Sequence, residues 1–156
     1  MLECGIHSAE WITPVFCLYV IQKLIDTNLE GPLQHFNFYI LPMLNPDGYL
    51  YSWSNYRLWR KNRRPHNCSA TDIPPMMNRG WARNLQHLND IDGTACYGVD
   101  LNRNFNISFG TYEEEEEKAA SFWSPTYHGP DAFSEPETQA VNSAFDWIAD
   151  KYEDSR

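Results

Sequence analysis

The order of apolar segments near the N-terminal end constrains the fold more than any other feature of the sequence. Residues 2–6 predict the end of a strand, and Ser8 after it is a suitable N-cap for a following helix. We expect that helix to cover residues 10–27, because Pro14 fits only the first turn of a helix. Its apolar positions cover more than one stripe, which predicts a well-buried helix. Residues 36–41 are an apolar run of strand length, so the segment predicts a strand–helix–strand unit.

The rest of the chain adds turns, loops and one more helix. The Asn-Pro-Asp-Gly sequence at 45–48 is typical of a turn, and residues 66–94 predict a long loop that can hold a short helix. Residues 98–106 have no helical pattern. The Ser-Glu-Pro-Glu sequence at 134–137 is a capping box, with the serine as N-cap, and precedes an amphipathic helix over 140–150. The alternation predicts the α/β class, a layered domain with too few strands here to close its sheet.

Charge and hydropathy exclude several classes of partner. Twelve basic against 21 acidic residues give a formal charge of −9, so we expect no nucleic-acid partner. The glutamates at 113–117 predict a solvated loop. The longest apolar stretch, residues 11–24, is interrupted by polar residues and is too short to span a bilayer. We therefore expect no membrane insertion, and we see no signal peptide within these residues.

His7 and Glu10 stand three residues apart at the predicted strand-to-helix turn. The carboxyl ends of strands in open α/β sheets are where ligands bind, and both residue types are zinc ligands. Considered alone, the pair is better explained as a capped helix start with an acid in its first turn.

A basic cluster occupies residues 57–64 of this acidic chain: Arg57, Arg60, Lys61, Arg63 and Arg64. One interpretation is a solvated face paired with nearby acids. The other is recognition of an anion, either a carboxylate or the oxyanion of a transition state. The aromatic residues interleaved with the cluster are interpreted as core.

The polar string at 100–104 also allows two interpretations. It fits a loop with Asp and Asn in turn conformations. It also fits a second anion site, with Arg103 as a carboxylate fork and Asn102 as a donor. In that case Asp100 is placed to orient a zinc-bound histidine from behind.

Five stretches taken together carry a resemblance to a known family. They are residues 3–12, 44–49, 57–61 and 98–105, and the pair 127–129 with 134–137. In this order and spacing the chain resembles the M14 family of zinc metallocarboxypeptidases, of the carboxypeptidase A and B type. The resemblance implies the zinc carboxypeptidase fold, an α/β/α layered mixed sheet, and one partial catalytic domain over residues 1–156.

The resemblance implies a metal site and a substrate site. His7 and Glu10 would be two ligands of one Zn²⁺, with Asp100 behind the His7 ring. Arg60 would stabilise the oxyanion and contact substrate. The free C-terminal carboxylate of a peptide would be bound by Asn102 and Arg103. The complete protein would be a monomeric exopeptidase acting on peptide and protein C-termini.

The cysteines gain an interpretation from the same resemblance. Cys4 and Cys17 match a disulfide pair of carboxypeptidase B-like members. We further hypothesise a Cys68–Cys96 disulfide, because the usual partner of Cys96 is absent from this sequence. Disulfides fit an extracellular, secreted protein.

The sequence also departs from the family. Ala9 stands where many members have a substrate-contacting arginine, and the third zinc ligand and the general-base glutamate are expected outside this chain. We therefore expect residues 1–156 alone to be inactive. Two alternatives are a non-catalytic module that binds peptide C-terminal carboxylates and a metallo-esterase or amidase of a more distant branch.

Overall fold

The computed structural model describes residues 1–26, 31–67, 95–111, 122 and 124–153. The chain divides into two compact units, Met1–Arg60 and Lys61–Arg156, which are described separately below. None of the described helices is long and apolar enough to cross a membrane.

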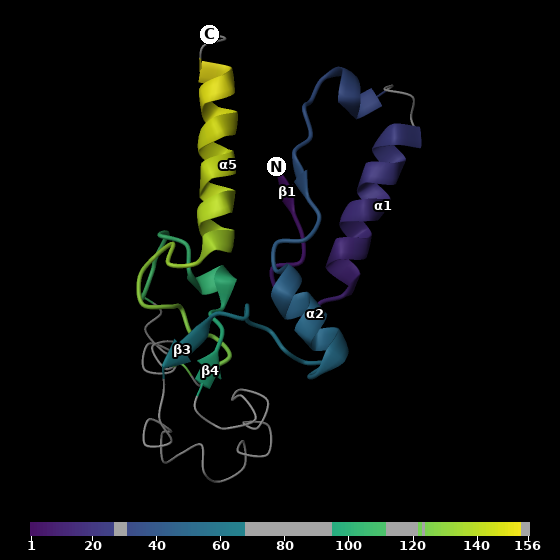
Figure 1. Cartoon of the computed structure of the whole chain (residues 1–156). Helices are drawn as coiled ribbons and strands as arrows, with labels where there is room; N and C mark the ends of the chain where they lie inside the picture. Colours follow the sequence, from purple (N-terminus) through teal and green to yellow (C-terminus); the bar gives the residue numbers. More distant parts are fainter. Residues whose placement is uncertain (27–30, 68–94, 112–121, 123, 154–156) are drawn as a thin grey trace. The chain divides into compact units, whose positions relative to one another are not determined.

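The first unit is built on a strand–helix–strand element. Its elements are β1 (Leu2–Glu3), α1 (Ile12–Asp26), the 3₁₀ helix η1 (Gly31–Gln34), β2 (Ile40–Leu41) and α2 (Pro46–Ser54) (Figure 1). Strands β1 and β2 pair in parallel, with Leu2 opposite Ile40 and Glu3 opposite Leu41. Helix α1 connects the two strands and packs against β2. The predicted strand–helix–strand order is confirmed, with both strands shorter than expected.

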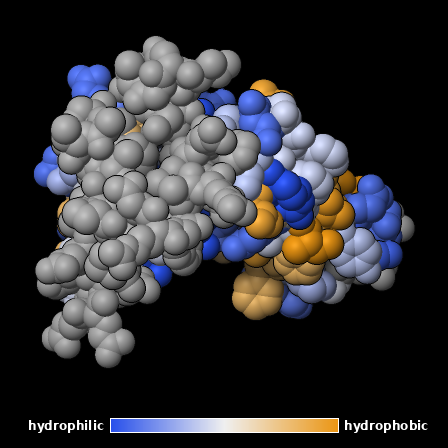
Figure 2. All heavy atoms as spheres, turned by 90° about the horizontal axis from the view of Figure 1, so that it is seen from below, coloured by the Kyte–Doolittle hydropathy of each residue, from blue (hydrophilic) through white to orange (hydrophobic). Residues whose placement is uncertain are grey.

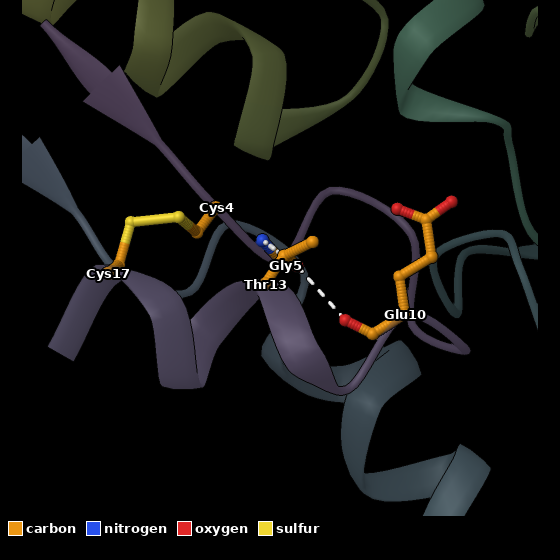
Figure 3. Close-up of a disulfide and its surroundings, with 5 residues drawn as sticks. All are labelled: Cys4, Gly5, Glu10, Thr13 and Cys17. Atoms are coloured by element: carbon orange, nitrogen blue, oxygen red, sulfur yellow. Dashed lines mark hydrogen bonds between the residues drawn. A yellow bond between two sulfur atoms is a disulfide. The ribbon is translucent and has the colours of Figure 1, made fainter. Parts of the chain in front are cut away.

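The start of α1 differs from the sequence expectation. The helix begins at Ile12 and has Pro14 in its first turn, but Ser8 does not cap it, because the Ser8 hydroxyl donates to the main-chain oxygen of Trp59. Thr13 acts at the helix start instead. Its hydroxyl donates to Glu10 O at 3.0 Å and accepts from Gly5 N at 3.1 Å, which joins the end of β1 to the first turn of α1 (Figure 3).

Residues 45–48 are the start of a helix rather than an isolated turn. The Asn45 side chain accepts from Gly48 N at 3.0 Å, and Pro46 takes the first helical position of α2. Both residues are favoured at a helix start, asparagine as N-cap and proline at N1. The Asn-Pro-Asp-Gly sequence that we predicted to form a turn therefore forms the N-terminal cap of α2.

The second unit contains an antiparallel strand pair and the long C-terminal helix. Its elements are β3 (Pro65–Asn67), β4 (Ala95–Tyr97), the 3₁₀ helix η4 (Leu101–Arg103) and α5 (Pro136–Glu153) (Figure 1). In the β3–β4 pair His66 lies opposite Cys96. The expected loop over 66–94 thus begins within a strand, while residues 68–94 and the glutamate run lie outside the described residues.

Helix α5 begins one residue later than a capping box would place it. Ser134 lies two residues before Pro136, and its hydroxyl donates to Glu135 Oε1 at 2.7 Å. The Glu137 carboxylate lies 3.3 Å from the Asn62 amide. The predicted box residues are present, but Ser134 bonds to its neighbour Glu135 and to Asn104, and Glu137 lies beside Asn62.

The expectation that α1 is well buried is wrong for this structure. Of its residues only Pro14 and Cys17 are buried, and several large apolar side chains of the helix are exposed: Ile12, Val15, Phe16, Leu18, Tyr19 and Ile25. Apolar side chains are visible at the molecular surface among the described residues (Figure 2). The physical reason is that α1 packs on the short strand β2, which covers one side of a helix that is apolar on several.

A disulfide joins Cys4 to Cys17 across a Cα–Cα distance of 6.3 Å (Figure 3). It fastens the end of β1 to the second turn of α1, and both sulfur-bearing residues are buried. Cys96 is also disulfide-bonded. Cys68, its expected partner, lies outside the described residues.

Replacing Cys4 and Cys17 together by serine should lower the free energy of unfolding by about 3 kcal/mol, from the lost restriction of the unfolded chain. Guanidinium unfolding of parent and double variant, in the protein translated from the whole transcript that encodes these residues, measures the difference. A change below about 0.5 kcal/mol would contradict this expectation.

Candidate metal and substrate site

His7 and Glu10 present two metal-binding atoms to one point in the first unit. His7 Nδ1 lies 3.0 Å from Glu10 Oε1. The His7 side chain is 9% exposed, whereas the Glu10 side chain is 47% exposed and can receive a ligand from solvent. Two donors bound to one tetrahedral zinc at about 2.1 Å would lie about 3.4 Å apart. The pair therefore fits two neighbouring zinc ligands, and the same geometry also suits a hydrogen-bonded pair without metal.

No group of three or more His, Cys, Asp and Glu side chains within the described part of the chain is arranged to hold a metal ion. The structure thus supplies a two-atom donor set, and further donors would have to complete the coordination.

The backbone of the turn that carries the pair is fixed by close packing. Gly5 has a φ of 71°, and a Cβ there would lie 3.0 Å from Met43 Sδ and 3.3 Å from Met43 Cα. Only glycine allows this approach at a positive φ. Asn45 then binds the turn, donating from its main-chain N to Gly5 O at 3.0 Å and from its side chain to Ile6 O at 3.1 Å.

Glu3 is a carboxylate near His7 that the sequence did not single out. Burial raises the pKa of Glu3, and the electrostatic interaction with His7 opposes that shift. Its Oε1 atom is buried without a hydrogen-bond partner. No sequence signal marked it, because its position in a short strand depends on the pairing with β2.

Arg60, the predicted oxyanion residue, is connected through its main chain to the turn that carries His7 and Glu10. Ser8, which lies between His7 and Glu10 in sequence, donates from its backbone N to Arg60 O at 3.3 Å. The turn that carries His7 and Glu10 is therefore hydrogen-bonded directly to the segment that carries Arg60.

The 100–104 segment in the second unit forms η4 with a buried acid at its start. Asp100 is fully buried, and its Oδ1 accepts from Asn102 N at 3.1 Å. Its own N–H donates to Tyr127 O at 2.7 Å. Asn102 is exposed and Arg103 is half-buried. The polar string is therefore an ordered segment in which both predicted carboxylate-binding residues reach solvent.

Asn104 anchors the end of η4, a role that its residue type did not reveal. Its amide nitrogen lies within 3.0 Å of His128 O, Asp131 O and Ser134 Oγ. Its Oδ1 accepts from the Thr138 hydroxyl at 2.7 Å. With the side chain fully buried, these bonds fix the backbone directly after Arg103.

A second buried network holds the other end of the segment. Glu135 is fully buried and accepts from Arg64 Nη1 at 2.6 Å and Asn62 Nδ2 at 2.8 Å. Asn62 Oδ1 in turn accepts from Val99 N at 2.8 Å. Arg64, which we placed in a cluster open to solvent or to an anion, instead neutralises a buried carboxylate.

Lys61 also departs from both interpretations of the basic cluster. It is 1% exposed, and its Nζ donates to Phe122 O at 2.7 Å beside the Tyr127 ring. Burial lowers the pKa of Lys61 to about 7, partly offset by the nearby Asp100 charge. Neither a solvated face nor an open anion site describes this lysine.

The Arg57 guanidinium packs over the ring of Trp11. Its guanidinium carbon lies 3.8 Å from the centre of the Trp11 ring, and its Nη1 donates to Ala9 O at 2.7 Å. Trp53 stacks on Trp11 with ring centres 4.0 Å apart. The basic cluster is thus divided among separate structural roles.

The comparison with protein families decides what these residues belong to. The zinc carboxypeptidase model, Peptidase_M14, matches residues 1–154. The chain belongs to the zinc carboxypeptidase family. This confirms the predicted resemblance and the metallocarboxypeptidase family that it named.

Individual relatives agree with the family. The chain is 36% identical to carboxypeptidase O of Homo sapiens over 147 residues, covering 91% of this chain and 32% of that protein. It is 39% identical to carboxypeptidase B2 of Rattus norvegicus over 148 residues, covering 90% of this chain and 28% of that protein. The chain therefore spans about a third of the length of these zinc carboxypeptidases.

A solved structure confirms the fold class. The structure of bovine thrombin-activatable fibrinolysis inhibitor in complex with tick carboxypeptidase inhibitor superposes with a TM-score of 0.69 at 34% identity. The match covers 96% of this chain and 41% of that one. The helices and small parallel and antiparallel strand pairs described above are thus part of the α/β fold of zinc carboxypeptidases.

The predicted site residues fall in both units. His7, Glu10 and Arg60 belong to the first unit, whereas Asp100 and the Asn102–Arg103 pair belong to the second. The geometry within each unit is as given above, and the catalytic roles remain predictions.

Replacing Lys61 by methionine should change how stability depends on pH. Because the pKa falls from 10.5 to about 7 on folding, the unfolded chain holds a proton that the folded chain lacks between these values. Parent stability should therefore rise with pH in that window, by up to about 1.4 kcal/mol per unit from this residue.

The Lys61→Met variant should lack this contribution, so its advantage over the parent should shrink as the pH of the unfolding measurement rises from about 7 to about 10. Lys23→Met, at an exposed position of α1, is the control. A parent–variant difference that stays constant across the range would contradict the assignment.

Proposed function

We propose that this chain is part of a zinc-dependent carboxypeptidase that removes the C-terminal residue from peptides and proteins. The observation that carries the proposal is the donor pair of His7 and Glu10, whose Nδ1 and Oε1 atoms lie 3.0 Å apart in a chain of the zinc carboxypeptidase family. Because the chain spans about a third of its relatives, the activity is proposed for the complete protein.

In this proposal His7 and Glu10 hold Zn²⁺, together with a ligand from outside residues 1–156. The bound ion would supply Lewis-acid chemistry and a water of lowered pKa, about 7. The glutamate that acts as general base also lies outside these residues. His7 is held in place by its buried position, so that its Nδ1 faces the Glu10 carboxylate.

The remaining residues bind and orient the substrate. The Arg60 guanidinium donates to the oxygen on which negative charge develops. By the family resemblance, Asp100 would accept a hydrogen bond from the His7 imidazole and so fix its tautomer. Asn102 and Arg103 bind the free carboxylate of the peptide, for which the planar guanidinium offers two parallel donors. This last contact would make the enzyme an exopeptidase.

The setting we propose is extracellular, with the complete protein acting as a monomer. The Cys4–Cys17 disulfide supports this setting, since disulfides persist in oxidising compartments. The partners would be peptide and protein C-termini.

A second candidate is a non-catalytic module that binds C-terminal carboxylates. It is favoured by one observation, that Asn102 is exposed and Arg103 half-buried on a segment fixed by the buried side chain of Asn104. A two-ligand site alone would hold zinc weakly.

His7→Ala should abolish zinc-dependent release of C-terminal residues by the protein translated from the whole transcript, lowering kcat/KM by at least about 10³-fold. His35→Ala removes an exposed histidine and is the matched control, which should keep parent activity. Chelation should inactivate the parent protein, and added zinc should restore activity.

A parent protein that releases no residue with zinc present, but binds free C-termini in preference to amidated ones, would replace the enzyme proposal with the binding module. Equal loss of activity in both histidine variants would refute the role of His7.

Arg103→Met should raise KM for peptides with a free C-terminal carboxylate by about 10–100-fold, because a charge-assisted pair is lost. The preference of the enzyme for free over amidated C-termini should shrink by the same factor. Measuring both substrates with parent and variant checks this, and an unchanged preference would remove Arg103 from the carboxylate site.

A further inference from the structure

The proposed function requires two groups to act on one atom. His7 and Glu10 would hold a zinc ion that supplies Lewis-acid chemistry at the carbonyl oxygen of the scissile bond, and Arg60 would donate to the same oxygen. The distance between metal pair and arginine must therefore be fixed in advance. We propose that Ser8 is the positioning residue that sets it, an inference that rests on the proposed function.

Ser8 lies between the two predicted zinc ligands in sequence and is 1% exposed. It forms hydrogen bonds to two successive main-chain oxygens in the segment that carries the arginine. Its N–H donates to Arg60 O at 3.3 Å, and its hydroxyl donates to Trp59 O across 51 positions of sequence. These bonds form a two-point connection, which restrains orientation as well as distance.

The opposite side of Ser8 is held by α2. Ser52 Oγ lies 3.1 Å from Ser8 O and accepts from Trp11 Nε1 at 2.8 Å. Ser52 is 3% exposed, so this contact is also shielded from water. The single hydroxyl proton of Ser52 is shared between Ser8 O and Tyr49 O, which lies closer at 2.7 Å. The N–H and hydroxyl of Ser8 are thus both bonded to residues 59–60, and its carbonyl oxygen is in contact with α2.

The partner segment is itself packed. Trp59 is 2% exposed, its N–H donates to Tyr56 O at 2.9 Å, and its ring meets Tyr51 edge-on with centres 5.1 Å apart. A buried tryptophan in this contact does not move without disturbing its neighbours. A shift of the Ser8 bonds would therefore be transmitted to Arg60, the next residue.

The side chain of Ser8 touches neither the substrate nor the metal in this account. It acts through Arg60, so its effect should disappear when Arg60 no longer works. A serine that only stabilised the fold would lower activity equally whether or not Arg60 were present. This difference separates a positioning role from a structural one.

The test uses Ser8→Ala, Arg60→Ala and the double variant in the protein translated from the whole transcript, with zinc content measured for each. Ser8→Ala alone should lower kcat about 10–100-fold, with KM and zinc stoichiometry close to the parent values. In the Arg60→Ala background the same change should lower kcat by less than about threefold. Ser54→Ala is the control, since its hydroxyl binds Leu50 O at an exposed position of α2.

A readout without catalysis accompanies the kinetics. Amide hydrogen exchange of metal-free protein should become faster at residues 57–61 in Ser8→Ala and stay unchanged at residues 18–26 of α1. Ser8→Cys keeps a weak donor of similar size and should fall between parent and alanine in both measurements.

Additive effects in the two backgrounds, or unchanged exchange at 57–61, would overturn the proposal. Loss of folding in both Ser8 variants would assign the residue to stability and also overturn it. An inactive parent protein with bound zinc would instead reject the proposed function, and the inference with it.

Discussion

The parallel pairing of β1 with β2 is the constraint on which the first unit depends. Two register positions fix the strands, and hydrogen bonds continue the pairing past their ends, from Cys4 N to Leu41 O and from Leu44 N to Cys4 O. This brings the turn before α1 against the start of α2. Without it the approach of Gly5 to Met43 would not be defined, whereas the turn from His7 to Glu10 is closed locally by Glu10 N donating to His7 O at 3.1 Å.

Buried amide side chains satisfy main-chain hydrogen-bonding groups in the irregular segments of this protein, as neighbouring strands do in a sheet. Asn45 fixes the turn that carries His7 and Glu10, and Asn104 fixes the backbone directly after Arg103. Each satisfies several main-chain groups that would otherwise be buried without partners, which is costly. Short irregular segments can therefore be as well defined as strands when one side chain closes their hydrogen bonds.

The basic cluster shows how one sequence pattern separates into different physical tasks. Arg57 stacks on Trp11, Arg64 neutralises the buried Glu135, and Lys61 is enclosed. Enclosure favours the neutral form of a lysine, whereas an arginine remains charged and needs a partner. These assignments depend on which neighbour each side chain meets, and spacing along the chain carries no such information.

The sequence by itself determined the family and the strand–helix–strand order, and it supplied the candidate site residues, because five family-like stretches follow one another in order along the chain. It could not predict that Asn45 begins a helix, that Ser8 binds Trp59, or that α1 keeps apolar residues in solvent. Those outcomes were decided by tertiary structure. A polar side chain bonds to whichever group the fold brings within about 3 Å, and burial depends on what packs against a helix face.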